Sequence, residues 1–115
     1  MKITASRWLL GVMCVAASCV QPALAASAAA TAHTSQIDIR NFAFAPKTLT
    51  VPVGTRVVWT NRDDEPHVIV SAGALFTSSH ALDTSDSYAV TFSKPGTYAY
   101  FCSIHPMMVG SIIVQ

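Results

Sequence analysis

Residues 100–108 form the most informative stretch of this sequence, Tyr100-Phe-Cys-Ser-Ile-His-Pro-Met-Met108. Within it Cys102, His105 and Met108 follow the spacing Cys-x-x-His-x-x-Met, which offers a thiolate, an imidazole and a thioether. The stretch lies between two strand-like segments, so we expect a tight loop at one end of a sheet. A loop between rigid strands can hold several metal ligands in a fixed geometry. Pro106 favours a turn that brings Met108 back toward Cys102.

A fourth ligand is expected from outside this loop, and His67 is the leading candidate. It follows the acidic turn of residues 63–66 and opens the next strand-like segment. This places it at a strand end, where the fold can bring it to the loop. His80 is the competing histidine, but it lies in a polar run of Thr and Ser that favours a solvated loop.

The donor set indicates which metal is bound. Two imidazoles, one thiolate and a weak axial thioether suit copper that cycles between Cu(I) and Cu(II). Structural zinc usually takes four Cys or His ligands, often from paired cysteines, and a second cysteine is missing here. Met107 is the alternative axial ligand, but we prefer Met108 because Met107 is then free to face solvent beside His105. We therefore predict one copper ion.

The first 25 residues have the pattern of a secretory signal. Lys2 and Arg7 make a basic start, residues 8–20 are apolar, and Ala23-Leu-Ala25 is a small-x-small cleavage site. We expect cleavage there, export to the periplasm, and no stable membrane association of the mature chain. Two alternatives remain: an uncleaved segment could anchor the chain in a membrane, and Cys19 could carry a lipid.

The mature chain is expected to consist of a leader and one domain. Residues 26–35 are rich in Ala, Ser and Thr and predict a flexible leader, and residues 36–115 predict a single domain. Without Lys2 and Arg7, five basic residues remain against six acidic ones, a net charge of about −1. This balance argues against a nucleic-acid partner, because phosphate binding needs a clustered basic face.

Cysteine usage supports a metal-binding role for the loop. The chain has three cysteines, and two of them, Cys14 and Cys19, lie in the predicted signal. The mature protein would keep only Cys102, which then has no disulfide partner and is open to oxidation in an exported protein. Coordination of a metal gives such a cysteine a reason to be present.

Short apolar alternations separated by Gly and Pro run through the domain and predict about seven strands without an amphipathic helix. The strand-like segments are residues 37–44, 49–53, 57–60, 68–70, 87–92, 98–102 and 111–114. This pattern predicts an all-β antiparallel sandwich or barrel, with a break at residues 71–74. The residues expected to fill its core are Phe42, Phe44, Val57, Trp59, Val90, Phe92, Tyr98 and Ile112.

From residue 37 to residue 114 the sequence resembles the cupredoxin family, in particular amicyanin and the pseudoazurin and plastocyanin group. The motifs that carry the resemblance are Phe42-Ala-Phe-Ala-Pro46, Val53-Gly-Thr55, Val58-Trp-Thr-Asn61, Pro66-His67, Pro95-Gly-Thr-Tyr98 and Cys102-Ser-Ile-His-Pro-Met-Met-Val-Gly110. The short Cys-x-x-His-Pro-x-Met loop is similar to that of amicyanin. The resemblance implies an eight-stranded Greek-key β-sandwich, a type 1 (blue) copper site, and electron shuttling between larger redox proteins.

Two positions depart from this pattern. Val68 stands where amicyanin-like proteins commonly have Asn after the first histidine, and Ser85 stands where relatives often have Gly. The amide of Val68 can still donate a hydrogen bond to the sulfur of Cys102. Neither change removes a ligand, so we expect both to affect tuning of the site rather than its presence.

The expected electron carrier would meet its partners near His105, whose ring edge should reach the surface. Pro106 and Met107 would form a small apolar patch around it, suited to a weak, transient contact with a larger redox protein. We expect a monomer that is not an enzyme. A copper carrier or buffer could use the same ligands. A hydrolase using Cys102 and His105 lacks a third group to orient the histidine, and a metal-free adhesion sandwich leaves the loop unexplained.

Overall fold

The computed structural model describes Gly11, Ala23 and residues 32–115 of the chain. Apart from Gly11 and Ala23, the predicted signal sequence lies outside the described residues, as does most of the predicted leader. Among the described residues, no helix is long and apolar enough to cross a membrane.

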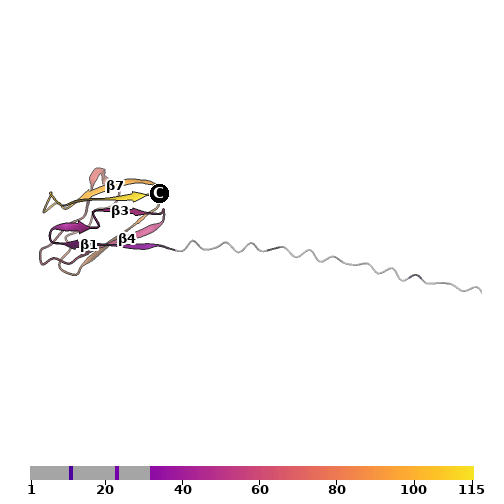
Figure 1. Ribbon diagram of the computed structural model, residues 1–115, viewed down its shortest axis with the longest axis horizontal. Helices are drawn as coiled ribbons and strands as arrows, with labels where there is room; N and C mark the ends of the chain where they lie inside the picture. Colours follow the sequence, from indigo (N-terminus) through magenta and orange to yellow (C-terminus); the bar gives the residue numbers. More distant parts are fainter. Residues whose placement is uncertain (1–10, 12–22, 24–31) are drawn as a thin grey trace, which may run out of the picture.

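Eight strands and one short 3-10 helix make up the described domain. They are β1 (Thr34–Arg40), β2 (Ala43–Ala45), β3 (Thr48–Val51), β4 (Thr55–Asn61), β5 (Val70–Ser71), η1 (Ala72–Ala74), β6 (Ser87–Phe92), β7 (Gly96–Phe101) and β8 (Val109–Val114). The strands form two four-stranded sheets, ordered β2-β1-β4-β6 and β3-β8-β7-β5. Figure 1 shows the sheets as two layers, with β7 and β3 above β1 and β4. The predicted all-β Greek-key sandwich is confirmed.

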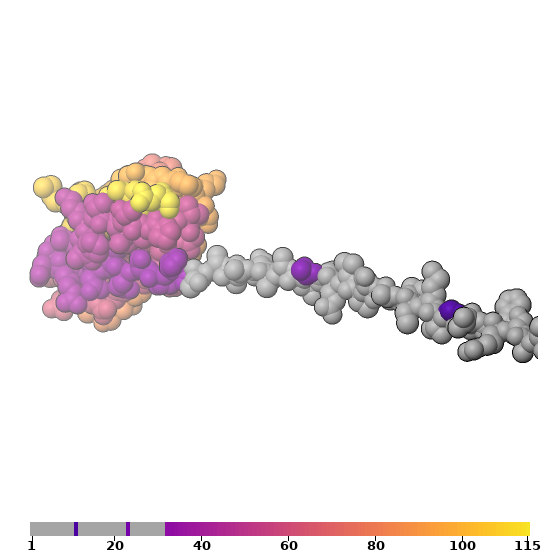
Figure 2. Space-filling view, turned by 45° about the vertical axis from the view of Figure 1, so that its right-hand side comes forward, coloured from indigo at the N-terminus to yellow at the C-terminus, as the bar shows by residue number. Residues whose placement is uncertain are grey.

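The two sheets are mixed, so the expectation of a purely antiparallel sandwich is wrong. β1 runs parallel to β4 and β3 runs parallel to β8, whereas the other strand pairs are antiparallel. In Figure 2 the yellow C-terminal strand lies beside magenta residues from the first half of the domain, as the β3–β8 pairing requires. Alternation of apolar residues predicts which face of a strand is buried, but it does not encode the direction of the neighbouring strand.

Two predicted boundaries also differ from the structure. β1 begins at Thr34, and its first two residues pair with β4, so the last two residues of the predicted leader belong to the sheet. The strand expected at residues 68–70 is reduced to Val70–Ser71, which pairs with the end of β7. The predicted break follows directly, as the 3-10 helix Ala72–Ala74.

Most of the predicted core residues are inside the sandwich. Those that are buried are Phe44, Val57, Trp59, Phe92 and Ile112, while Val90 and Tyr98 are partly buried and pack against them. Phe42 is the error, because 47% of it is exposed. Asn41 and Phe42 both have positive φ, so the chain turns between β1 and β2 and the parity that relates Phe42 to Phe44 is lost.

Tyr100 fills the core just before the metal-ligand loop. It is 1% exposed, its ring centroid lies 4.7 Å from that of Phe44 and 5.3 Å from that of Trp59, and burial raises the pKa of its phenol to about 12. On β8 it faces Gly110, where an added Cβ atom would lie 2.5 Å from the Tyr100 ring. The close fit of these two residues fixes β7 against β8 at the base of the loop.

Candidate metal centre

Three predicted ligands come together at one end of the sandwich. The donor atoms of His67, Cys102 and His105 all lie within 4.8 Å of one another. The Cys102 Sγ atom is 3.8 Å from the Nδ1 atom of His67 and 3.8 Å from the Nδ1 atom of His105. His80 is exposed and is not a member of this group. The residues converge although 35 positions separate His67 from Cys102.

Cys102 follows the last residue of β7 and is fully buried. Its backbone N–H donates to the carbonyl of Met108 (3.0 Å), and the N–H of Met108 donates to the carbonyl of His105 (2.8 Å), so the loop closes on itself. The amide of Val68 donates to the Cys102 sulfur at 3.4 Å, as expected from the sequence. A donated hydrogen bond of this kind stabilises the thiolate form.

His67 is held from two sides although it does not open a regular strand. It is fully buried and forms an isolated bridge with Leu82, to which it is joined by backbone hydrogen bonds of 3.1 and 2.8 Å. The Asn61 side chain donates to the carbonyls of Glu65 (2.8 Å) and Leu82 (3.0 Å), which secures the turn before His67. The backbone of this histidine is therefore fixed by Asn61 and Leu82 together.

Asp63 was not expected at the site from the sequence, and its carboxylate orients the His67 ring. The Oδ2 atom of Asp63 lies 2.9 Å from Nε2 of His67, which leaves Nδ1 directed to the thiol. Partial burial alone would raise the pKa of Asp63, but hydrogen bonds from the amides of Phe42 and Asn41, together with His67, lower it overall. The i,i+4 spacing of Asp63 and His67 was the one feature of the sequence that could have indicated this contact. It does so only when the conformation of the turn between them is known.

Phe42 is the second functional residue that the sequence did not place at the site. Its ring lies edge-to-face against both imidazoles, with centroid distances of 5.6 Å to His67 and 5.0 Å to His105. The His67 and His105 rings are themselves 5.1 Å apart. Phe42 thus covers the histidine side of the site rather than filling the core.

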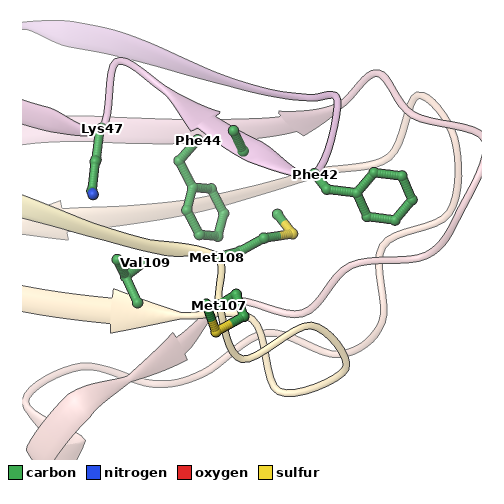
Figure 3. Close-up of a pocket in the computed structure, with 7 residues that line it drawn as sticks. Phe42, Phe44, Lys47, Met107, Met108 and Val109 are labelled. Atoms are coloured by element: carbon green, nitrogen blue, oxygen red, sulfur yellow. The ribbon is translucent and has the colours of Figure 1, made fainter.

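The two neighbouring methionines differ sharply in exposure. Met108 is 4% exposed, whereas Met107 is 93% exposed. Both line a shallow pocket with Phe42, Phe44 and Val109, and Figure 3 shows these side chains around the end of the sandwich. Met107 therefore faces solvent, as expected from the sequence, while Met108 as the axial ligand stays a prediction.

The chemistry and spacing of the donor atoms fit a copper ion. A metal about 2.0 Å from nitrogen and about 2.3 Å from sulfur, with a trigonal angle of about 120°, would place the nitrogen and sulfur atoms about 3.7 Å apart. Both Sγ–Nδ1 distances are 3.8 Å, close to this separation. Two imidazoles and one thiolate are three of the donors of a copper electron-transfer centre, and Met108 is buried in the same loop. The fold and these donors define a copper-binding β-sandwich.

Comparison with known proteins gives the family. The Cupredoxin-like domain family matches residues 8–114, and the chain belongs to the cupredoxins. It is 30% identical over 97 residues to amicyanin-alpha of Methylorubrum extorquens, which covers 81% of this chain and 82% of the relative. It is 37% identical over 84 residues to the chloroplastic plastocyanin of Tetradesmus obliquus, which covers 63% of this chain and 58% of that protein.

Solved structures agree with this assignment. A variant of amicyanin in the Cu(I) state is similar with a TM-score of 0.67 and 31% identity, covering 71% of this chain and 82% of that one. The copper-containing nitrite reductase of Thermus scotoductus gives a TM-score of 0.65 and 35% identity, covering 70% of this chain but only 22% of the reductase. The chain is therefore similar to one part of that larger protein.

Proposed function

We propose that the protein carries single electrons between larger redox proteins, with one type 1 copper ion held by His67, Cys102, His105 and Met108. The observation that carries this proposal is the convergence of the imidazole nitrogens of His67 and His105 on the Cys102 sulfur at 3.8 Å. Copper bound there would supply a one-electron Cu(I)/Cu(II) couple. The amicyanin and plastocyanin relatives support this function.

The residues around the site keep its geometry fixed and exclude water. His67 and Cys102 are fully buried, Asp63 holds the His67 ring through Nε2, and the amide of Val68 donates to the Cys102 sulfur. A site that changes little between two oxidation states needs little reorganisation when an electron arrives or leaves. A copper carrier must instead open its site to release metal, so this burial favours electron transfer over the copper-carrier alternative.

The surface beside His105 is the proposed place of electron exchange. His105 is partly exposed, and Met107 beside it is 93% exposed, while Phe42 and Val109 are about half exposed. This apolar surface suits a small and short-lived contact between a monomer and larger redox proteins. The basic, apolar and small regions at the start of the chain support export to the periplasm as the place of this exchange.

Adding Cu(II) to the metal-free protein tests the proposed function. We expect one equivalent to give an intense blue colour and an EPR spectrum with narrow copper hyperfine splitting. Electron self-exchange between the two oxidation states should then be fast, while transfer of copper to an acceptor protein should be slow. A colourless protein would contradict the type 1 site, and rapid copper transfer with slow self-exchange would favour the carrier.

Substitution of Met107 tests the proposed contact surface. Met107→Lys should lower the second-order rate of electron exchange with a redox partner by about tenfold, because it places a charge in an apolar contact. The visible spectrum should not change, since Met107 is 93% exposed and is not one of the proposed ligands. Leu75→Lys is the matched control, because Leu75 is also an exposed apolar residue (60%) but lines a different pocket. Equal rates in wild type and Met107→Lys with every partner tried would place the contact elsewhere.

A further inference from the structure

One carboxylate joins two turns that lie more than 20 residues apart in the sequence. The Oδ1 atom of Asp63 accepts a hydrogen bond from the amide of Asn41 (2.6 Å), and Oδ2 accepts one from the amide of Phe42 (2.9 Å). The same Oδ2 atom lies 2.9 Å from Nε2 of His67. The turn between β1 and β2 is thereby tied to the turn that carries a copper ligand.

The backbone of the β1–β2 turn is strained where this carboxylate holds it. Asn41 has φ 51° and Phe42 has φ 56°, both in the left-handed region that residues with a side chain rarely adopt. Asparagine tolerates this conformation, whereas a bulky aromatic residue does so only when its surroundings impose it. The two hydrogen bonds to Asp63 are the contacts that impose it here.

This backbone conformation places the Phe42 ring across the copper-ligand histidines. Its edge-to-face contacts with His67 and His105 have interplanar angles of 81° and 82°. His105 is the more exposed of the two histidines, and its backbone belongs to a loop. The Phe42 ring is therefore in a position to restrict rotation of the His105 imidazole.

We propose that Asp63, Asn41 and Phe42 form a latch that holds the His105 ring in place and slows the loss of copper. Asp63 is a positioning residue in this latch, because it acts on His105 only through the backbone and ring of Phe42. The proposal rests on the ligand set given above. Its three residues lie in turns that flank strands of the β2-β1-β4-β6 sheet, whereas the copper loop joins β7 and β8 of the other sheet. It also explains why a half-exposed phenylalanine is kept in a strained conformation.

A double-mutant cycle in the full-length, copper-loaded protein tests the latch. Phe42→Ala removes the ring. In Asp63→Asn, the side-chain NH₂ group faces the backbone N–H of either Asn41 or Phe42, whichever way the amide is turned, so one of the two hydrogen bonds is lost. We measure the rate at which Cu(I) passes to the chelator bathocuproine at pH 7. Phe42→Ala should raise this rate about tenfold, and Asp63→Asn should raise it about 10- to 100-fold because it also releases His67.

The interaction between the two substitutions is the decisive quantity. If Asp63 acts on His105 through Phe42, the double variant should release copper more slowly than the product of the two single effects predicts. Leu75→Ala is the control for loss of an exposed apolar side chain and should leave the rate unchanged. Multiplicative effects, or an unchanged rate in Phe42→Ala, would overturn the latch.

A second measurement separates the latch from the assignment of the ligands. NMR relaxation of the His105 ring in the metal-free protein should show greater mobility than wild type in Phe42→Ala and in Asp63→Asn. Leu75→Ala should show the same mobility as wild type. Equal melting temperatures of the metal-free Phe42→Ala and Leu75→Ala variants would show that a difference in the mobility of the His105 ring is a local effect and does not reflect a loss of overall stability. If wild type binds no copper, the ligand assignment fails, but the mobility of the His105 ring still decides whether the latch exists.

Discussion

Cys102→Ser is expected to abolish the blue colour and to weaken copper binding by more than about 100-fold. Replacement of groups that only orient a metal ligand already costs about 10- to 100-fold in affinity, so loss of the strongest donor must cost at least as much. A serine hydroxyl has a far higher pKa than a thiol, does not bind as an anion at neutral pH, and supplies no soft sulfur for Cu(I). Copper affinity measured against a competing chelator, together with the visible spectrum, gives the answer.

Ser103→Ala is the matched control for Cys102→Ser. Ser103 is the next residue in the same loop, but it is exposed and contributes no donor atom to the cluster. We expect its blue colour and copper affinity to equal those of wild type. An intense blue band that persists in Cys102→Ser would contradict the assignment of Cys102 as the thiolate ligand.

Gly110→Ala is expected to destabilise the metal-free protein by about 1–3 kcal/mol. The new Cβ atom would lie 2.5 Å from both the Cζ and Oη atoms of Tyr100, well inside van der Waals contact. The Tyr100 ring cannot move aside, because it is 1% exposed and packs against Trp59 and Phe44. At an unhindered position the same change would stabilise the protein by about 0.4–1 kcal/mol, so the clash decides the sign.

Urea unfolding of the metal-free variants measures this effect. Combining Gly110→Ala with Tyr100→Phe removes the Oη atom but leaves Cζ at 2.5 Å, so only part of the lost free energy of unfolding should return. Ser111→Ala, at the next position of β8, serves as the control for a changed side chain on the same strand. A Gly110→Ala variant as stable as wild type would show that β7 and β8 can separate at the base of the loop.

The parts of the site that could be predicted from the sequence are those fixed by local spacing. Cys102, His105 and Met108 lie within one short loop, so their spacing alone indicates a ligand set. His67 required the additional expectation that a strand end would meet this loop. The Cys102 sulfur also accepts the predicted hydrogen bond from the amide of Val68, because a backbone donor does not depend on the side chain at that position.

The parts that could not be predicted depend on backbone conformation and on strand direction. Phe42 and Phe44 share a parity that suggests one buried face, but the left-handed turn at Asn41 and Phe42 redirects the first ring to the histidines. Asp63 is an ordinary acidic turn residue until the β1–β2 turn is brought beside it. By contrast, Ser85 has φ 71°, which accounts for the expectation of glycine at that position in relatives.

The unequal exposure of the two histidines has a consequence for how such a carrier works. His67 is sealed inside the sandwich, and His105 alone of the two reaches the surface. If an electron donor and an electron acceptor both bind at the His105 edge, their binding surfaces overlap, so neither can bind while the other is bound. The donor and the acceptor must then bind alternately. The maximum rate of electron transfer between them is set by how quickly each partner dissociates.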